Sequence, residues 1–430
     1  MERRKFLAGA GAVTAGAVAA ATPGSPANAV PGVRRVETGL DVLVGSGFAD
    51  LAGQRVGVIS NPTGVDSAYR HLVDLMHGSG SVQVVAAFGP EHGFRGSAQA
   101  GGSEGTGTDA RTGITVYDAY GASQAKWESM FTQADVDTVV FDIQDVGARF
   151  YTYIWTMYTS MVAAARVGKR YVVLDRPNPV GGRAHGPMMT PAYTSGVGLK
   201  EIVQQHGMTV GELARLFNAE FLPADAGRSV ELNVVRCRNW KRELLAADTD
   251  LPWVMPSPNM PTPDTALVYP GTCLFEGVAS ITEGRGTCRP FELIGGLAGD
   301  FDYHWGDRLN ARSLPGVEFR EAYFAPTSAG QKPALLNKLC AGVEVKVVDR
   351  AAYDPIRTAV AMLVEARRYP AFAWRMDSWD TVRPYWVDKL TGSPRLRTMI
   401  DAGADVDDVV GAWADELTAF EQRRKPYLLY

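Results

Sequence analysis

Short apolar runs separated by turn residues recur along the first half of the chain. Runs of this kind, rich in β-branched residues, predict strands at 55–60, 82–88, 114–117, 138–143, 170–175 and 231–236. Between several of them, apolar residues recur at the spacing of one helix face. This spacing predicts helices over 123–134 and 150–167, and another that begins at the capping box Thr209-x-x-Glu212. Strands that alternate with helices predict an α/β fold with a parallel sheet flanked by helices.

One further helix is expected between the first two strands. Asp66 can cap it, Tyr69 and Leu72 would lie on its buried face, and Gly78 would end it.

The pattern becomes irregular in the second half of the chain. Five prolines between residues 252 and 263 are expected to hold the backbone extended. Further on, strands are predicted near 317–323 and 343–348, and helices over 355–367 and 406–422. We therefore expect a large α/β domain over residues 30–262 and a smaller α+β domain over residues 263–430, with a cleft between the two domains.

Residues 1–29 have the features of an export signal and are not expected to belong to the fold. The pair Arg3-Arg4 is typical of a twin-arginine signal, an Ala- and Gly-rich segment follows, and Ala27–Ala29 fits a cleavage site. No cysteine adjoins that site, so no lipid anchor is predicted. We expect an exported protein without a membrane anchor.

The composition narrows the classes of function. The 430 residues include 43 basic and 47 acidic side chains, a formal charge of −4, and loss of one acid and three basic residues with the signal shifts it to −6. Such a charge does not favour a nucleic-acid partner. The four cysteines are too widely spaced for a metal knuckle; Cys273 and Cys288 could form a disulfide, and buried free thiols are the alternative. The oligomeric state is not specified.

Four of the predicted strands end in polar turns, which begin at Asn61, Glu91, Asp142 and Asp175. In open α/β sheets, ligands bind at the carboxyl ends of the strands. These turns, together with Asp145, therefore predict a site along one edge of the sheet that faces the C-terminal domain.

The stretch FGPEHGFRG at residues 88–96 carries the densest chemistry. It follows a buried strand and places Glu91, His92 and Arg95 within five residues. A carboxyl group on a glycine turn, backed by an apolar strand, is a candidate general acid. The alternative is a polar loop in which Glu91 and Arg95 form only a surface salt bridge.

A second stretch, LFEGVASITEGRGTCRPFE at residues 274–292, repeats this acid, glycine and arginine chemistry. It contains Glu276, Glu283, Arg285 and Glu292. The alternative interpretation of this stretch is a solvated hairpin.

Other common types of site are not favoured. The glycine-rich segment 101–107 matches neither a dinucleotide fingerprint nor a P-loop, so no nucleotide cofactor is predicted. Possible metal ligands occur at His92, Asp142, Asp145 and His206. The chain has no H-E-x-x-H motif and no close histidine pair, however, so no metal is predicted either. The absence of G-x-S-x-G argues against a serine hydrolase.

Several motifs follow one another in a fixed order: FGPEHGFRG, FDIQDVGARFYTY, LDRPNPVGG, HGMTVGELA, PSPNMPT, YPG, and EGRGT followed by PFE. In this order they resemble the secreted exo-β-N-acetylmuramidases of the NamZ type. These glycoside hydrolases remove N-acetylmuramic acid (MurNAc) from the non-reducing end of peptidoglycan fragments. The resemblance runs from about Gly39 to the C-terminus. It implies a Rossmann-like domain without a nucleotide, a smaller C-terminal domain and an active site in the cleft.

The resemblance also implies site residues, by position in the motifs. The matching positions are Glu91, His92, Asp142, Asp145, Arg149, Tyr151, Asn178, His206, Asn259, Glu283 and Arg285. Two positions depart from the family pattern: His185 stands where an acid is common, and Gln205 stands where an arginine is common. If either position serves catalysis or grips the lactyl carboxylate, this member has altered efficiency or preference.

Glycoside cleavage needs a protonated acid at the leaving oxygen and a second group on the opposite face of the sugar. We expect Glu91 to be the acid, with Asp142, Asp145 and Glu283 as candidates for the second role. That role is either attack on the sugar or orientation of the substrate's own acetamido group. The remaining matching positions would bind the substrate.

The lactyl carboxylate of muramic acid suits a bidentate guanidinium, which Arg149 or Arg285 could supply. The alternative function is an exported two-lobed binding protein that closes on a muramyl ligand without chemistry. The two functions differ in whether a carboxylate pair straddles the sugar, and in turnover.

Overall fold

The computed structural model describes residues 35–99, 101–328, 330 and 332–430. The predicted export signal lies outside these residues. Residues 35–430 form one compact unit. Within the described part of the chain, no helix is both long and apolar enough to cross a membrane.

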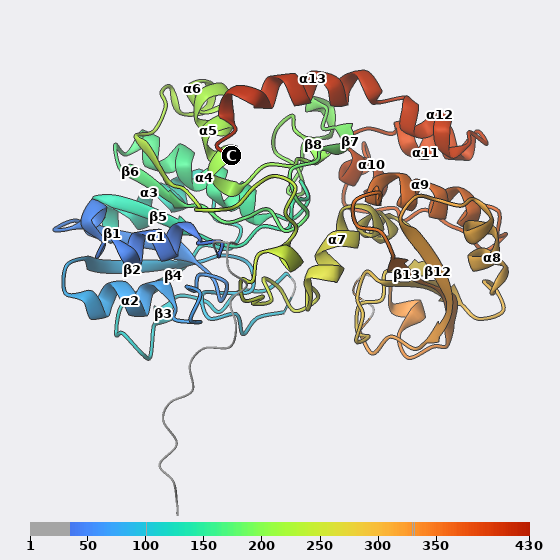
Figure 1. Ribbon diagram of the computed structural model, residues 1–430, viewed down its shortest axis with the longest axis horizontal. Helices are drawn as coiled ribbons and strands as arrows, with labels where there is room; N and C mark the ends of the chain where they lie inside the picture. Colours follow the sequence, from blue (N-terminus) through green and yellow to red (C-terminus); the bar gives the residue numbers. More distant parts are fainter. Residues whose placement is uncertain (1–34, 100, 329, 331) are drawn as a thin grey trace, which may run out of the picture. The chain divides into compact units, whose positions relative to one another are not determined.

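A seven-stranded, mostly parallel sheet forms the first part of the fold (Figure 1). Its strands, in spatial order, are β3 (Gly107–Thr108), β4 (Thr115–Asp118), β2 (Gln83–Gly89), β1 (Arg55–Ser60), β5 (Thr138–Asp142), β6 (Arg170–Leu174) and β9 (Leu232–Val235). Every neighbouring pair is parallel except β3 with β4. The predicted α/β fold is confirmed, and the helices between the strands provide the crossover connections that parallel strands need.

Helices cover both faces of this sheet. They are α1 (Gly39–Gly45), α2 (Leu72–Ser79), α3 (Gln124–Gln133), α4 (Tyr153–Arg166) and α5 (Val210–Glu220). Side chains of β5 alternate between two cores: Val139 and Phe141 join the core that contains α3, α4 and α5, while Val140 joins the core that contains α1 and α2. This period of two makes the sheet the middle layer of three.

The capping box that opens α5 is present as predicted. The Thr209 hydroxyl accepts from the Glu212 amide at 3.2 Å, and the Glu212 carboxylate accepts from the Thr209 amide at 3.0 Å. The long connection from β6 to β9 also contains the antiparallel pair β7 (His185–Met188) and β8 (Val203–Gln205), and α6 (Leu222–Ala226).

The prediction that Asp66 caps the first of the sheet-flanking helices is wrong. That helix, α2, begins at Leu72, and His71 is its N-cap. The Asp66 carboxylate instead accepts from the amides of Ala68 and Arg70, which closes a turn before the helix. Tyr69 is consequently 66% exposed rather than buried.

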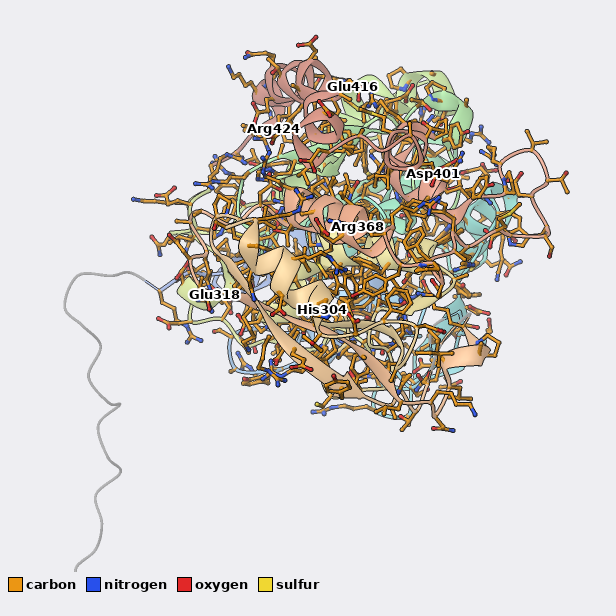
Figure 2. All side chains as sticks on the ribbon, turned by 90° about the vertical axis from the view of Figure 1, so that its right-hand side faces the viewer. His304, Glu318, Arg368, Asp401, Glu416 and Arg424 are labelled. Atoms are coloured by element: carbon orange, nitrogen blue, oxygen red, sulfur yellow. The ribbon has the colours of Figure 1, made fainter. Side chains whose placement is uncertain are left out.

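The second part of the fold is built on a four-stranded antiparallel sheet. Its order is β10 (Ile281–Thr282), β11 (Leu293–Leu297), β13 (Cys340–Val347) and β12 (Val317–Phe324). The helices α8 (His304–Ala311) and α9 (Pro355–Ala366) accompany it. Figure 2 looks onto this part, with His304 at the start of α8, Glu318 in β12 and Arg368 just beyond α9.

Two predictions for this half need correction. Pro263 does not extend the chain but opens α7 (Pro263–Thr272), since proline suits the first turn of a helix. The single helix expected over 406–422 is two helices, α12 (Val406–Gly411) and α13 (Ala414–Arg424). Trp413, which lies between them, is buried in the core. The remaining helices are α10 (Trp386–Thr391) and α11 (Arg395–Asp401).

The C-terminal segment returns to the large sheet after α13 (Figure 1). Arg215 of α5 donates to the Tyr427 carbonyl at 2.7 Å, and the Tyr430 hydroxyl donates to Asp175 at 2.7 Å. Asp175, at the sheet edge, is therefore covered by the last residue of the chain. All four cysteines are free thiols, so the possible Cys273–Cys288 disulfide is absent.

Candidate active site

The polar turns singled out in the sequence do share one edge of the sheet. Glu91 follows β2, Asp142 ends β5 and Asp175 follows β6, and β1 joins these strands in a parallel arrangement. Their carboxyl ends therefore point the same way.

A pocket of about 170 Å³ opens at this edge, and we call it the acid pocket. Its wall includes Glu91, His92, Tyr151, Thr152, Ser257, Asn259, Tyr269, Glu276 and Arg285. These residues come from the loop after β2, the segment before α4, the proline-rich segment, α7 and the 3-10 helix η4 (Cys273–Gly277). Both halves of the chain thus build one site.

Glu91 is half-buried on this wall. Its Oε1 accepts from the Gly101 amide at 2.9 Å, and its Oε2 accepts from the Thr152 hydroxyl at 3.3 Å. Arg95 points elsewhere, to Asp74 at 3.0 Å and Asp109 at 2.9 Å. The alternative that Glu91 only forms a salt bridge with Arg95 is therefore wrong.

The loop that carries Glu91 is held in shape by Glu104. The Glu104 carboxylate accepts from the amides of Arg95 at 3.1 Å and Ser97 at 2.8 Å. Gly93 has φ 87°, and a Cβ there would lie 2.2 Å from the Glu104 side chain. Only glycine fits at this point, which explains the glycine directly after Glu91-His92.

His92 also lines the acid pocket. Its Nδ1 lies 3.1 Å from the Ala98 carbonyl oxygen. Because a carbonyl only accepts, Nδ1 carries the hydrogen of this contact. The backbone of His92 is left-handed, with φ 70°, an unusual conformation for a residue with a side chain.

Tyr151 supplies a neutral hydroxyl. Its ring meets the edges of Tyr153 and Tyr269, with centroids 5.4 and 5.5 Å away. Burial, together with the nearby Tyr153, raises the pKa of Tyr151 well above its ordinary value. The hydroxyl therefore stays protonated and can donate to a ligand.

Glu276 and Arg285 form the wall contributed by the second half of the chain. Arg285 Nη2 lies 2.5 Å from Glu276 Oε1, and Trp386 donates to Glu276 Oε2 at 3.4 Å. Burial alone would lower the pKa of Arg285, but Glu276 and Glu283 outweigh it, so the guanidinium stays charged. Glu276 lies in the second stretch but is not among the site residues predicted from the sequence. The available signal was an acid seven residues before Glu283.

Glu283 lies behind Arg285 and is almost fully buried. Its carboxylate contacts Arg285 Nε at 3.0 Å and Lys332 Nζ at 2.5 Å. Burial alone would raise the pKa of Glu283, but the two cations lower it below its usual range. The solvated-hairpin interpretation is wrong, and a carboxylate kept ionised in this way is unsuited to be the proton donor.

The comparisons with known proteins agree with this architecture. A family model described as exo-beta-N-acetylmuramidase NamZ, N-terminal, matches residues 56–264, and its C-terminal counterpart matches residues 267–430. The chain belongs to the NamZ family. The peptidoglycan beta-N-acetylmuramidase NamZ of Bacillus subtilis (strain 168) is 42% identical over 401 residues, which are 92% of each chain. This NamZ-family protein is thus a glycoside hydrolase rather than a binding protein without catalysis.

Two solved structures share the fold of this NamZ-family enzyme. Both are DUF1343 family proteins from Bacteroides fragilis NCTC 9343. The BF0371 protein is 32% identical with a TM-score of 0.82 and covers 93% of this chain and 100% of its own. The BF0379 protein is 31% identical with a TM-score of 0.71 and covers 92% and 99%.

Two of the carboxylates proposed for catalysis in this NamZ-family enzyme do not line the acid pocket. Asp142 is fully buried and binds Arg176 through both oxygens, at 2.5 and 2.9 Å. Asp145 accepts from His206 Nε2 at 3.1 Å and from the Gly147 amide at 2.7 Å. Both side chains are buried away from the acid pocket, although Asp145 Oδ1 has no hydrogen-bond partner among the described residues, and their contact with substrate stays a prediction.

Three of the predicted substrate ligands also lie outside the lining of the acid pocket. Arg149 is fully buried and donates to the carbonyls of Pro187, Ile202 and Leu390 at 3.0, 2.8 and 2.6 Å. Burial lowers its pKa to about 9. Asn178 is also buried and donates to the Met208 carbonyl at 3.0 Å.

His206 is the last of these buried residues. Its Nδ1 accepts from the Met208 amide at 3.2 Å, which leaves Nε2–H to donate to Asp145. Arg149, Asn178 and His206 thus bind parts of the fold together and do not reach the acid pocket.

The two departures from the family pattern lie together, away from Glu91. His185 and Gln205 are paired across β7 and β8. Both line a separate cavity of about 270 Å³, and none of its lining residues also lines the acid pocket. These positions therefore do not grip a ligand beside Glu91. Within the described residues, no cluster of three or more His, Cys, Asp or Glu side chains could hold a metal ion.

Proposed function

We propose that this enzyme releases MurNAc from the non-reducing end of peptidoglycan fragments that end in MurNAc-GlcNAc. The observation that carries this proposal is the acid pocket, where Glu91, Glu276 and Arg285 line one small cavity. Two carboxyl groups are what glycosidic cleavage requires, and a guanidinium is what a lactyl carboxylate recognises best.

Glu91 is the general acid in this proposal. Its partners are a backbone amide and a hydroxyl, and no cationic side chain pairs with it among the described residues. A sugar in the pocket would exclude water, and a desolvated carboxyl group holds its proton more readily. That proton passes to the glycosidic oxygen as the bond to the leaving sugar breaks.

Glu276 takes the second role, in place of Asp142, Asp145 and Glu283. Arg285 and Trp386 fix its orientation from behind, as a group that must face the sugar requires. From there it acts on the sugar face opposite Glu91.

Arg285 reads the lactyl carboxylate. It uses Nε for Glu283 and one N–H of Nη2 for Glu276, and a guanidinium has five N–H donors. Three donors are left for the substrate, enough for a bidentate contact.

The decisive experiment replaces Glu91 with glutamine. Glu91→Gln keeps the shape of the side chain but cannot deliver a proton, so kcat should fall about 10²–10⁴-fold with little change in KM. A nitrophenyl N-acetylmuramide, whose leaving group needs little protonation, should partly rescue the variant. Glu318→Gln, an exposed glutamate in β12 (Figure 2), is the matched control. Near-normal turnover of MurNAc-GlcNAc by Glu91→Gln would remove Glu91 from this role.

We also propose that residues 1–29 direct the protein out of the cytoplasm as a twin-arginine signal. The support is the Arg3-Arg4 pair followed by an apolar segment and a small-residue cleavage site. Replacing both arginines with lysine should retain the precursor inside the cell. A mature protein that still begins at Met1 outside the cell would contradict the proposal.

A further inference from the structure

Four cavities adjoin one another in a row that passes Glu91. On one side of the acid pocket lies a cavity of about 430 Å³, which we call the basic chamber, and the two share Asn259, Glu276 and Arg285. A cavity of about 510 Å³, which we call the aromatic chamber, shares Glu91 and Thr152 with the acid pocket and Trp386 with the basic chamber. Glu91 thus stands between two chambers, where a bond to be cut would lie.

The row continues beyond the aromatic chamber. A fourth cavity of about 570 Å³, which we call the outer chamber, shares Thr159 and Leu199 with it. A substrate that passes Glu91 on this side therefore has room for more than one sugar.

Charge divides the two sides of Glu91. The basic chamber is lined by three cations, Arg285, Lys332 and Arg375, and by two carboxylates, Glu276 and Glu283, so the cations are in excess by one. Among the described residues that line the aromatic chamber there is no Lys, Arg or His, and aromatic side chains such as Tyr120 and Trp386 are prominent. The charged muramic acid therefore belongs on the basic side, and the neutral leaving sugar belongs in the aromatic chamber.

Positive charge returns in the outer chamber. Arg166 and Lys200 both line it. Lys200 Nζ lies 2.8 Å from Asp225 and 5.4 Å from the centre of the Tyr158 ring, and its side chain is 22% exposed. Arg166 lies 3.4 Å from Glu128, which does not line the chamber, and donates to the Asp225 carbonyl at 2.7 Å. Asp225 is thus the one carboxylate against two cations in the described lining, and a second carboxylate could be bound there.

The order of the chambers is basic, aromatic and basic again, and glycan strands of peptidoglycan alternate a charged N-acetylmuramic acid with a neutral N-acetylglucosamine (GlcNAc). We infer that the row is a binding groove for a glycan strand, in which the outer chamber binds the second muramic acid through Lys200 and Arg166. The inference rests on the proposed function and extends it from a disaccharide to longer strands whose lactyl groups carry a free carboxylate.

The test compares three substrates of the intact enzyme. They are MurNAc-GlcNAc, the tetrasaccharide (MurNAc-GlcNAc)₂, and a second tetrasaccharide in which three N-acetylglucosamine units follow MurNAc. The second tetrasaccharide lacks the second carboxylate. We expect kcat/KM for first release from the tetrasaccharide to exceed that for the disaccharide roughly threefold to tenfold, mainly through KM. The tetrasaccharide with the N-acetylglucosamine tail should show a smaller increase in kcat/KM over the disaccharide. Added salt should reduce the difference between the two tetrasaccharides.

In Lys200→Gln, the ratio of kcat/KM for the tetrasaccharide to that for the disaccharide should fall. It should come close to the ratio that the parent enzyme shows for the substrate with the N-acetylglucosamine tail. Lys126→Gln, an exposed lysine of α3 outside the groove, should leave all three values unchanged. Equal kcat/KM for disaccharide and tetrasaccharide in the parent enzyme would overturn the inference, as would a Lys200→Gln ratio equal to that of the parent. Failure to cleave any of the three substrates would instead overturn the proposed function.

Discussion

The carboxylates on the edge of the large sheet and those on the wall of the acid pocket look alike in the sequence but behave differently in the fold. Asp142 and Asp145 are enclosed, and Arg176 or His206 already binds them. Glu91 and Glu276 lie on the surface of a cavity. Position on a cavity wall, rather than the number of hydrogen bonds from the chain, therefore marks an acidic residue as a candidate for chemistry here.

The two arginines expected to read the lactyl group show the same contrast. Arg149 donates to three backbone carbonyls and holds the β7–β8 region to α10, while its Nε is buried without a partner among the described residues. Arg285 keeps donors free on the pocket wall. Residues in matching motifs therefore divide into those that build the site and those that face the substrate.

The largest effect expected from breaking this contrast is on stability. Asp142→Asn leaves Arg176 buried without its counter-charge, which should lower the free energy of unfolding by about 3–5 kcal/mol. Urea unfolding measures this change. Asp135→Asn, which removes an exposed partner of Arg55, is the control and should cost about 1 kcal/mol or less. Unchanged stability with lost turnover in Asp142→Asn would mean that Asp142 acts in the chemistry.

Glu276→Gln should do the reverse. We expect kcat to fall about 10²–10³-fold, ~3–4 kcal/mol of barrier, with an unchanged melting temperature. Steady-state kinetics on MurNAc-GlcNAc and thermal unfolding are measured together, with Glu318→Gln beside it. If Glu276→Gln melts early and turns over normally, the pocket-wall carboxylate is structural and the contrast fails.

Substitutions of Arg285 and Arg149 should differ in their effect on substrate specificity. Arg285→Lys keeps the charge but loses the planar fork, so the preference for muramic acid over N-acetylglucosamine should drop about tenfold, or ~1.4 kcal/mol. The ratio of kcat/KM for the two nitrophenyl glycosides measures it. Arg149→Lys should lower the melting temperature and keep the ratio. If Arg149→Lys loses the preference and Arg285→Lys keeps it, Arg149 rather than Arg285 binds the lactyl carboxylate.

The smallest effect concerns acid stability near Glu91. A hydrogen bond from Arg95 lowers the pKa of Asp109 from 3.8 to about 2. A carboxyl group whose folded pKa is lowered stabilises the fold above pH 3.8, and this contribution disappears as the pH falls towards 2. Between pH 5 and pH 2, the free energy of unfolding of Asp109→Asn should fall by about 1 kcal/mol less than that of the parent enzyme. Glu91→Gln should retain it, and a loss there would restore Glu91 as the partner of Arg95.

Much of the fold follows from the sequence because its causes are local. A β-branched run such as 138–143 becomes β5, and Thr209 with Glu212 caps α5, since period and cap geometry need only a few neighbouring residues. The start of α2 was misplaced because Asp66 can either cap a helix or close a turn, and in the fold it closes a turn. The motif order also indicates the family, because seven motifs in sequence are specific.

The candidate site is only partly predictable for the opposite reason. Glu91, His92, Tyr151, Asn259 and Arg285 do line the acid pocket, as the motifs indicate. Whether Asp142 is free depends on Arg176, 34 residues away, and whether Arg149 is free depends on the Leu390 carbonyl, 241 residues away. The sequence by itself determined which polar groups exist and on which sheet edge they stand. Only the tertiary structure decided which of them remain open to a ligand, because hydrogen-bond partners and burial are set by contacts between distant segments.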